Sequence, residues 1–498
     1  MTTRPEKHRT ALSTPRSRRE PPRAASRRRR SPAALVVALL AALAGGCERG
    51  ARDAAPTRPN VLLVSFDTTR ADHTSAYGYE RPTTPRLAAL LATSIRFDAA
   101  YAPMPTTMPS HSSMFTGVFP RTHGVVKNGL ALAPGTPTLA AALSAAGYRT
   151  AGFVSSFVLD RRFGASQGFE TWDDHFGEGS CKMAAKNWEG RDLEESFCRR
   201  GAETRARAES WLESNGYLSG ASAGSGAAAA ATPAPPFFLF VHFFDPHDPY
   251  APLPEHAALF PPAPGDDARI AQQVAAYDGE IHYADEQLGL LLDRLAQAGI
   301  LDWTLVVVVG DHGEGLMQHG WMNHGLHLYE EAVHVPLVVR WPARLAGGRS
   351  IAEPVELTDL TPTVLALAGV AAPDIRPQGR SLAGALTGGE KLDPERPVFL
   401  QRRHYEGKVR PGVEAYGLKV GVRKGRWKYI ECKVEQTREL YDLASDPHEL
   451  TNLVDAHGEE AGRLAATIEK WLSETPEAAR GGVSGKDAER LRALGYVQ

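Results

Sequence analysis

The sequence predicts an α/β protein built on a doubly wound, largely parallel sheet, followed by a small antiparallel sheet with a helix. Three nearly unbroken apolar runs, at 60–66, 237–244 and 304–309, have the composition of strands that are covered on both faces. Helical stretches at 138–146 and 269–298 lie between such runs, and each is closed by a glycine. Strands that alternate with helices form parallel sheets, in which ligands bind beyond the carboxyl ends of the strands.

All three apolar runs lead into acidic residues. The first run stops at Asp67, the second is followed directly by Asp245, and the third reaches Asp311 after one glycine. Because parallel strands end at the same edge of a sheet, we expect these three carboxylates to share one rim.

The pattern changes near residue 397. From there the apolar runs are brief, as at 398–400 and 427–430, and a single helix at 461–472 follows them. This pattern predicts the small antiparallel sheet with its helix. The low-complexity segment 218–236 is interpreted as a surface insertion rather than a domain boundary. We therefore divide the chain into a signal peptide, a tether, an α/β domain, a C-terminal subdomain and a tail, at 1–46, 47–58, 59–396, 397–475 and 476–498.

The composition is that of a globular chain. With 498 residues, 43% hydrophobic and 23% charged, it is not collagen-like, disulfide-knotted, coiled-coil or wholly disordered. Residues 1–30 hold eleven Arg or Lys, so the rest of the chain, with 45 basic and 56 acidic residues, is acidic. An acidic body argues against nucleic acid as a partner.

Residues 1–46 are interpreted as a targeting segment. The basic head precedes the run AALVVALLAALAGG, which is too short for a transmembrane helix and suits the apolar region of a signal peptide. The run ends at Cys47, and this boundary resembles a bacterial lipoprotein cleavage box, although the usual large aliphatic residue three places earlier is missing. We expect export by the general secretory route to the bacterial cell envelope, at the periplasm or cell surface, with a lipid on Cys47 that anchors the protein to a membrane. Ordinary secretory cleavage and an uncleaved anchor are the alternatives.

Three further cysteines follow Cys47, and none of them has the spacing of a metal cluster. In an oxidising compartment Cys181 and Cys198 could form a disulfide that stabilises the intervening loop. Two unpaired thiols are the alternative.

Asp311 and His312 form a candidate metal-binding pair. They follow a buried strand, and flanking glycines permit the sharp turn that would let both side chains reach one divalent ion. Alone, such a pair could simply be a turn that caps the next helix. Asp67, at an equivalent strand end, supplies a second carboxylate and favours a metal site.

Thr107 is the candidate nucleophile. Pro109 and Gly117 frame a short helix and place Thr107 at or beside its N-terminus, where free backbone N–H groups favour an anion. A threonine hydroxyl is a poor nucleophile unless a metal ion lowers its pKa, so it needs the site at Asp67, Asp311 and His312 beside it. Without that cluster, a plain N-cap threonine would be the simpler interpretation.

Many short motifs follow one another over about residues 58–475. They are 60–67, the T-x-P-S-H…TG segment at 107–117, PRTHG at 120–124 with Asn128, FFLFVHFFDPHDPY at 237–250, VVVVGDHG at 306–313, LYEE…VP at 328–336, DLTPT at 359–363, GRSL at 379–382 and LYDL…DP…NL at 440–453. In this order they resemble the sulfatase family of the alkaline phosphatase superfamily. The resemblance implies a three-layer α/β/α sandwich with a mostly parallel sheet, a smaller C-terminal sheet subdomain, a metal at the strand ends, and ester hydrolysis through a covalent intermediate.

The sequence departs from that family at its active site. Thr107 replaces the cysteine or serine that sulfatases mature to formylglycine, and His111 replaces an arginine. Thr68 stands at the second strand-end aspartate. The segment 152–155 lacks the lysine and histidine that hold sulfate in the family.

The remaining set of Asp67, Thr107, Asp311 and His312 is similar to the metal site of threonine-dependent relatives. These are nucleotide pyrophosphatase/phosphodiesterases, phosphonoacetate hydrolases and lipoteichoic-acid synthases, which act on phosphorus. The resemblance thus implies one or two divalent ions, Zn, Mn, Ca or Mg.

Three further residues are candidate ligands of a second ion, namely Asp245, His247 and His324. A second ion would neutralise phosphoryl oxygens, the task of Arg and Lys in sulfatases. His247 could instead be the general acid for the leaving oxygen. Among the other histidines, His242 is expected in the core, and His319 and His327 at the surface or supporting a ligand.

We therefore expect an exported metalloenzyme that cleaves a phosphate, phosphonate or sulfate ester through a metal-bound Thr107, with phosphorus favoured over sulfur. Its substrate would be a small-molecule, glycan or lipid ester. The alternative is a catalytically inactive lipoprotein of the same fold that binds an anionic glycan or lipid. The complete set of Asp67, Thr107, Asp311 and His312 favours the enzyme, because anion binding alone does not require it. A transferase that uses an envelope lipid is a third option, but the chain has no multi-pass membrane domain.

Overall fold

The computed structural model describes residues 58–177, 187–188, 191–192, 197–218, 234–264, 267–475 and 477–478. These belong to one compact unit, Pro56–Gln498. The predicted signal peptide, Cys47, Cys181, the tail beyond residue 478 and most of the low-complexity insertion lie outside the described residues. None of the described helices combines the length and apolar character that crossing a bilayer requires.

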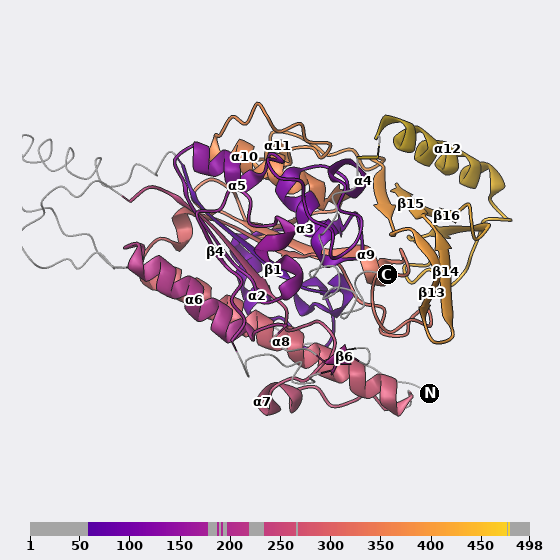
Figure 1. Ribbon diagram of the computed structural model, residues 1–498, viewed down its shortest axis with the longest axis horizontal. Coiled ribbons are helices and arrows are strands. Elements are labelled where there is room, and N and C mark those ends of the chain that lie inside the picture. Colours follow the sequence, from indigo (N-terminus) through magenta and orange to yellow (C-terminus); the bar gives the residue numbers. More distant parts are fainter. Residues whose placement is uncertain are drawn as a thin grey trace, which may run out of the picture. The chain divides into compact units, whose positions relative to one another are not determined.

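A nine-stranded sheet forms the centre of the described chain (Figure 1), in the order β10-β2-β9-β8-β1-β7-β3-β4 with β11 beside β2. β9 runs antiparallel to β8 and β2, and the other neighbouring pairs are parallel. The strands are β1 (Asn60–Phe66), β2 (Ile95–Tyr101), β3 (Arg149–Phe153), β4 (Thr171–Asp173), β7 (Phe237–Phe243), β8 (Thr304–Gly310), β9 (His334–Arg340), β10 (Arg349–Ile351) and β11 (Val355–Glu356). The predicted mostly parallel sheet is confirmed.

Helices cover both faces of this sheet, because alternate residues of each buried strand point to opposite sides. On β1, Val61 and Leu63 pack in one apolar cluster with α3, α5 and α10, whereas Leu62 and Val64 pack in another with α2, α6 and α8. Figure 1 shows α5 and α10 on one side of the sheet and α6 and α8 on the other. The helices are α2 (Pro85–Leu90), α3 (Thr107–Thr116), α4 (Pro120–His123), α5 (Leu139–Ala145), α6 (Gly201–Ser214), α7 (Pro254–Ala257), α8 (Ala268–Gln297), α9 (Glu330–Val333), α10 (Leu360–Ala368) and α11 (Ala383–Leu386). The three-layer arrangement expected from the resemblance is present.

The two helical stretches predicted between the apolar runs form where the sequence places them. Thr138 caps α5, since its hydroxyl accepts a hydrogen bond from the Ala141 amide. Asp267 caps α8 by accepting from the amides of Arg269 and Ile270. Both caps satisfy backbone donors that the first helical turn leaves free.

The C-terminal part contains a second, fully antiparallel sheet in the order β12-β15-β16-β17, as predicted. Its strands are β12 (Val398–Gln401), β15 (Lys419–Lys424), β16 (Trp427–Cys432) and β17 (Thr437–Asp442). Helix α12 (Gly458–Glu474) packs on it through Leu464, Ile468 and Trp471. A separate hairpin of β13 (Tyr405–Arg410) and β14 (Val413–Gly417) extends from this region, and two short strands, β5 (Asn187–Trp188) and β6 (Arg191–Asp192), pair elsewhere.

Candidate functional site

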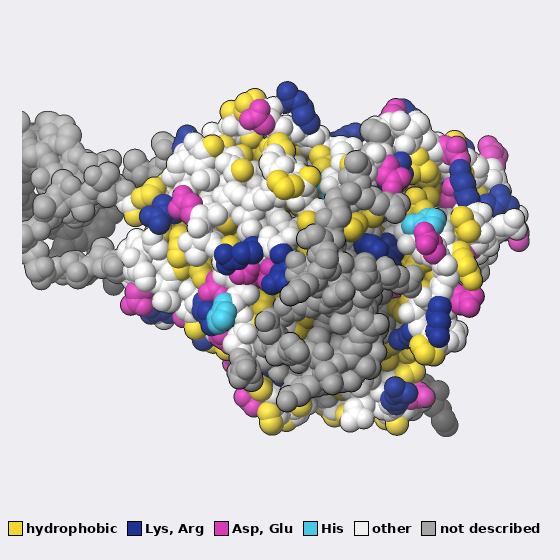
Figure 2. All heavy atoms as spheres, viewed as in Figure 1, with side chains coloured by type: hydrophobic (Ala, Val, Ile, Leu, Met, Phe, Trp, Pro, Cys, Tyr) yellow, Lys and Arg dark blue, Asp and Glu magenta, His cyan; other side chains and the backbone are white. Residues whose placement is uncertain are grey.

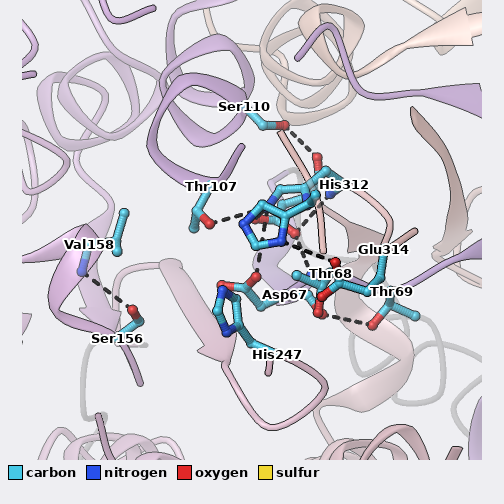
Figure 3. Close-up of polar contacts among 12 residues, drawn as sticks. Asp67, Thr68, Thr69, Thr107, Ser110, Ser156, Val158, His247, His312 and Glu314 are labelled. Carbon is cyan, nitrogen blue, oxygen red and sulfur yellow. Dashed lines mark hydrogen bonds and ion pairs between the residues drawn. The ribbon is translucent and has the colours of Figure 1, made fainter. Parts of the chain in front are cut away.

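The carboxyl ends of β1 and β8 and the N-terminus of α3 meet at one place. Asp67 follows β1, Asp311 and His312 follow β8, and Thr107 is the first residue of α3 (Figure 3). All four side chains are buried, with at most 1% of any residue exposed. The four residues predicted for the metal site and the nucleophile therefore converge, as the strand-end argument requires.

The Thr107 hydroxyl points at the imidazole of His312. Thr107 Oγ1 lies 3.2 Å from His312 Nε2, which is 3.5 Å from Asp311 Oδ2 and 3.8 Å from Asp67 Oδ1. His312 Nδ1 lies 3.0 Å from the Gly313 carbonyl oxygen, which can only accept, so Nδ1 carries the proton. The lone pair of Nε2 thus faces the threonine hydroxyl and both carboxylates, the tautomer that a metal ligand needs.

Thr68 holds the turn after β1 in an unusual backbone conformation. Its φ is +48°, in the left-handed region, which costs a β-branched residue about 1–2 kcal/mol. The conformation aims the Thr68 amide at Asp311 Oδ1, 3.0 Å away, while the Tyr277 hydroxyl donates to the Thr68 carbonyl at 2.6 Å. Asp311 Oδ1 also accepts from the amide of His312. One oxygen of Asp311 is therefore occupied by backbone donors and the other is left for the site.

Asp67 and Asp311 each have one buried carboxylate oxygen, Oδ1 and Oδ2 respectively, with no hydrogen-bond partner among the described residues. One ligand atom each from Asp67, Asp311 and His312 lie within 4.8 Å of one another. An unpaired buried anionic oxygen is costly, so buried charges in proteins are paired or coordinate metals. Two such oxygens beside an imidazole lone pair fit a divalent cation.

The electrostatics of the two carboxylates differ. Burial favours a raised pKa at Asp67, but the hydrogen bond from His242 and the imidazoles of His247 and His312 outweigh it and lower the pKa of Asp67. Burial together with the neighbouring charge of Asp67 raises the pKa of Asp311 well above its ordinary value. Without a cation, protonation is therefore favoured at Asp311 rather than at Asp67, and a cation would displace that proton on binding.

Helix α3 presents Thr107 without using its side chain as a cap. Thr106 is the N-cap residue and makes no side-chain capping bond. The Met108 amide donates to Asn128 Oδ1, and Ser110 Oγ donates to the Asp311 carbonyl oxygen, which ties α3 to the end of β8. The Thr107 hydroxyl thus faces the metal-ligand candidates, in contrast to the plain N-cap interpretation.

His111 stands one turn after Thr107 and is uncharged. Its Nδ1 donates to the Thr107 carbonyl at 2.8 Å, so its Nε2 accepts from Ser65 Oγ at 2.9 Å. Burial, helped by the nearby imidazole of His242, lowers the pKa of His111 to about 3. His111 therefore supplies no positive charge where the resembling family has an arginine.

His242 was predicted to be a core residue, and it is buried, but it also belongs to the site. Its Nε2 lies 3.1 Å from Asp67 Oδ2, and His111, His242 and Asp311 form a second group of possible ligands. The sequence held a signal for this role. His242 interrupts an otherwise apolar strand that is adjacent to β1, in register with Ser65.

The structure does not bring Asp245 into either group of possible ligands. Its two oxygens accept from the Gly201 amide at 3.0 and 3.2 Å, at the N-terminus of α6, and Arg200 lies 3.6 Å away. The role of Asp245 as a second-ion ligand stays a prediction. An orphan amide and the partial positive charge of a helix N-terminus hold this carboxylate.

His247 and His324 do lie at the site. The His324 ring centroid is 4.5 Å from that of His312 and 5.0 Å from that of His247. His324 Nδ1 is 3.3 Å from Glu314 Oε1, and the charge of Glu314 raises the pKa of His324 against the effect of burial. Figure 3 shows His247 beside Asp67. Glu314 lies on the side of the cluster away from Thr107.

The other histidines and the cysteines are placed as follows. His319 contacts Glu331 at 2.7 Å, and burial lowers the pKa of His327 to about 4. Cys198 is disulfide-bonded, Cys181 lies outside the described residues, and Cys432 is a buried free thiol. The pairing of Cys181 with Cys198 stays a prediction.

Comparison with known proteins gives one consistent answer. The family model described as Sulfatase matches residues 59–370, and one described as N-sulphoglucosamine sulphohydrolase, C-terminal, matches residues 317–477. The chain is 26% identical over 458 residues to the choline-sulfatase of Rhizobium meliloti (strain 1021), covering 80% of this chain and 83% of that protein. It is 26% identical over 467 residues to an arylsulfatase of Clostridium perfringens, covering 80% and 91%.

Two solved structures share the fold. One, described as a complex with its substrate D-glucosamine-2-N,6-O-disulfate, superposes with a TM-score of 0.69 at 20% identity and covers 84% of this chain and 98% of its own. The phosphonate monoester hydrolase of Agrobacterium radiobacter gives a TM-score of 0.65 at 23% identity, covering 84% and 95%. At these identities the likeness establishes the architecture.

Proposed function

From the premise that this chain belongs to the sulfatase family of the alkaline phosphatase superfamily, and is a sulfatase-like ester hydrolase, we propose that it cleaves a phosphate or phosphonate ester through Thr107 in preference to a sulfate ester. One observation carries the proposal. The Thr107 hydroxyl lies 3.2 Å from His312 Nε2, beside two buried carboxylate oxygens that have no partner in the described chain.

Asp67, Asp311 and His312 are proposed to hold a divalent cation. When bound there, the cation would lower the pKa of the Thr107 hydroxyl and offset the negative charge of the ester oxygens. The protein fixes the donors in advance, because Asp311 is oriented by the Thr68 amide and His312 by the Gly313 carbonyl.

Thr107 is proposed to attack the phosphorus atom. Thr107 would be ionised before the attack, with its hydroxyl proton passing to solvent. The bond from Oγ1 to phosphorus forms as the bond to the alcohol breaks, and His247 gives its proton to the departing alcohol. A water molecule then attacks phosphorus and displaces Thr107, and His247 takes the proton of that water and returns to its starting state. His247 lies beside Asp67 and is stacked on Phe244 at 4.4 Å between ring centroids, which supports an oriented imidazole.

The preference for phosphorus rests on missing positive charge. His111 is neutral, and the 152–155 segment, Gly-Phe-Val-Ser, is buried and carries no cation. A sulfate cradle built on arginine and lysine is therefore not available at these positions. His324, whose pKa is raised, is proposed to contact the ester oxygens in its place.

The names of the relatives include both sulfate ester and phosphonate ester hydrolases. Names among them include choline-sulfatase and arylsulfatase, and one structural neighbour is a phosphonate monoester hydrolase. The metal, the export to the bacterial envelope and the lipid anchor at Cys47 belong to the same proposal. The substrate class, a small-molecule, glycan or lipid ester, is open to direct test.

The decisive experiment compares initial rates of the metal-loaded protein on four matched substrates, the 4-nitrophenyl esters of sulfate, phosphate and phenylphosphonate and bis(4-nitrophenyl) phosphate. We expect a phosphorus ester to be hydrolysed fastest and Thr107→Ala to abolish that rate. A faster rate on the sulfate, or an unchanged rate in Thr107→Ala, contradicts the proposal. No turnover of any ester, with binding retained, supports the alternative of an inactive anion-binding protein.

A further inference from the structure

The segment that carries His324 is held by the C-terminal part of the chain. Arg410 Nη1 donates to Asn323 Oδ1 at 3.1 Å, the Tyr405 hydroxyl donates to the Gly325 carbonyl at 3.2 Å, and Arg402 Nη1 donates to the Leu326 carbonyl at 3.4 Å. Tyr405 and Arg410 both belong to β13 of the β13–β14 hairpin. The hairpin is therefore part of the wall of the active site.

The same segment lies against the start of α3. A Cβ atom built on Gly325 would come within 3.9 Å of the Pro105 carbonyl oxygen and of the Thr106 side chain, the residues just before Thr107. Since Tyr405 touches Gly325 directly, the aromatic ring of the hairpin is two contacts away from the nucleophile.

Two arginines lie over aromatic rings at this wall. The guanidinium carbon of Arg403 is 4.1 Å from the centroid of the Tyr405 ring, and that of Arg410 is 3.6 Å from the centroid of Trp321. The Trp321 indole N–H points to the His324 carbonyl oxygen at 3.4 Å. The two stacked pairs, Arg403 on Tyr405 and Arg410 on Trp321, thus flank the segment that carries His324. Figure 2 shows Lys and Arg side chains on the surface over β13 and β14.

Neither arginine has an acidic partner in the described part of the chain. Other arginines of this fold are neutralised, for example Arg402 by Glu435, Arg199 by Asp173 and Arg396 by Asp359. No carboxylate among the described residues lies within 4.0 Å of Arg403 or Arg410, and Arg403 Nε is buried without a hydrogen-bond acceptor. Each guanidinium therefore keeps N–H donors for an anion, which in Arg410 are those other than the Nη1 donor to Asn323.

We propose that Arg403 and Arg410 form a second anion-binding subsite at the rim of the active site, and that the natural substrate is an ester carrying a second anionic group. The reacting ester would face Thr107, while a further phosphate, sulfate or carboxylate on the same molecule contacts the β13–β14 hairpin. This inference rests on the proposed hydrolysis at Thr107 and names the substrate class of that site.

The test measures binding in a Thr107→Ala background, so that no ligand is consumed. Isothermal titration of the metal-loaded protein compares glucose 6-phosphate with glucose 1,6-bisphosphate, which differ by one phosphate on the same sugar. We expect the bisphosphate to bind at least about tenfold more tightly, since a charge-assisted contact is stronger than a neutral one. Arg403→Gln with Arg410→Gln should remove that advantage, lowering the affinity for the bisphosphate more than the affinity for glucose 6-phosphate.

Two controls separate a subsite from general charge attraction or misfolding. Arg426→Gln removes an exposed arginine of the same subdomain, one that is paired with Asp442, and should leave the ratio of affinities unchanged. Arg403→Lys keeps the charge but not the planar group and should retain only part of the advantage. Equal affinities for the two sugars, or a ratio that Arg426→Gln lowers as much as the double variant does, overturns the subsite. Absence of turnover in the wild-type protein would overturn the hydrolytic function and leave the binding result standing.

Discussion

At the scale of single residues, Asp67 and Asp311 stand out when no cation is present. Each is fully buried, each has one oxygen without a hydrogen-bond partner among the described residues, and the charge of Asp67 raises the cost of ionising Asp311. The pair is therefore a site where stability and metal binding oppose one another.

Asp311→Asn should separate these two quantities. The amide oxygen can still accept from the Thr68 and His312 amides, while the repulsion of Asp67 is removed, so we expect the metal-free protein to gain about 1–2 kcal/mol in its free energy of unfolding. Metal content and turnover should both fall, because a neutral amide is a weak ligand. Urea unfolding of the metal-free form and elemental analysis provide the two readouts. Full metal occupancy in Asp311→Asn would refute the assignment of the site.

Substitutions of Thr107 test the nucleophile itself. Thr107→Ala should keep the fold and most of the metal but lose nearly all turnover, whereas Thr107→Ser should keep part of it because the hydroxyl survives. Thr107→Ser should lose part of the turnover because serine rotates more freely about χ1, whereas the β-branched carbon of threonine restricts this rotation.

Thr107→Cys, co-expressed with a formylglycine-generating enzyme, is a further check on Thr107. It should remain a poor sulfatase, because His111 is neutral and the 152–155 segment lacks cations. Rates on the aryl sulfate and the phosphorus esters measure all three variants, and efficient sulfate hydrolysis by Thr107→Cys would show that the missing cradle does not matter.

At the scale of elements, the contact between α9 and the C-terminal sheet centres on one buried lysine. Lys428 of β16 is fully buried and lies 2.9 Å from both Glu330 of α9 and Glu449. Burial and the neighbouring Glu330, opposed by Lys428, leave the pKa of Glu449 raised to about 8. At neutral pH the lysine is therefore the counter-charge of Glu330, whose pKa it lowers, and a close polar partner of Glu449.

Lys428→Met should cost about 3–5 kcal/mol of stability, the loss typical when one partner of a buried ion pair is removed. The matched control is Lys433→Met on the same sheet, where the pair with Glu469 is more than half exposed and the stability should stay within about 0.5 kcal/mol of wild type. Chemical denaturation at neutral pH measures both. Equal stability of the two variants would show that Lys428 is not needed to neutralise Glu330.

A second contact in this region should depend on pH. His319 pairs with Glu331 and stacks on Tyr329 at 3.8 Å, and although burial favours a lower value, Glu331 raises the pKa of His319. Because the folded state binds this proton more tightly, the stabilisation is complete below the ordinary value of 6.5 and is lost as pH rises through the raised pKa. The stability difference between wild type and His319→Gln should therefore be larger at pH 6 than at pH 9. A difference that does not change with pH would mean that the pair stabilises through packing alone.

The elements that the sequence predicted are those with a simple local signal. The apolar runs of β1, β7 and β8 and the capped helices α5 and α8 match the structure to within a residue or so. The reversed direction of β9 was not predicted, since its apolar sequence is compatible with either direction and only its pairing with β8 and β2 decides it.

The site was predictable to the extent that a strand end fixes a position. The rule predicted that Asp67, Asp311 and His312 lie together, and one ligand atom of each is within 4.8 Å of the others. Asp245 has an equivalent backbone position, but its carboxylate accepts from the Gly201 amide of α6. The sequence predicted only a core position for His242, because a histidine inside an apolar strand has the pattern of a core residue. Its contact with Asp67 was not predicted. Side-chain direction depends on neighbours that sequence spacing does not reveal.

At the scale of the whole molecule, the N-terminal segment makes one clear prediction about location. If Cys47 carries the lipid, Cys47→Ser should move the protein from the membrane fraction to the soluble fraction, because one residue then removes the anchor. Fractionation followed by N-terminal sequencing checks this. Retention in the membrane with an intact N-terminus would identify an uncleaved anchor instead.

The pairing of β1 with β8 also governs when the metal ligands can assemble. The Thr68 amide that orients Asp311 lies 243 residues earlier in the chain, so no nascent chain can build the donor set before its residues 311 and 312 have emerged. A chain that crosses the membrane unfolded, as residues 1–46 predict, would first gather these ligands outside the cytoplasm. When several ions bind a site with similar affinity, their availability in the compartment decides which one is bound. The site would therefore take up the ion that is abundant where folding finishes. The concentrations of metal ions in the cytosol would then not determine which ion occupies the site.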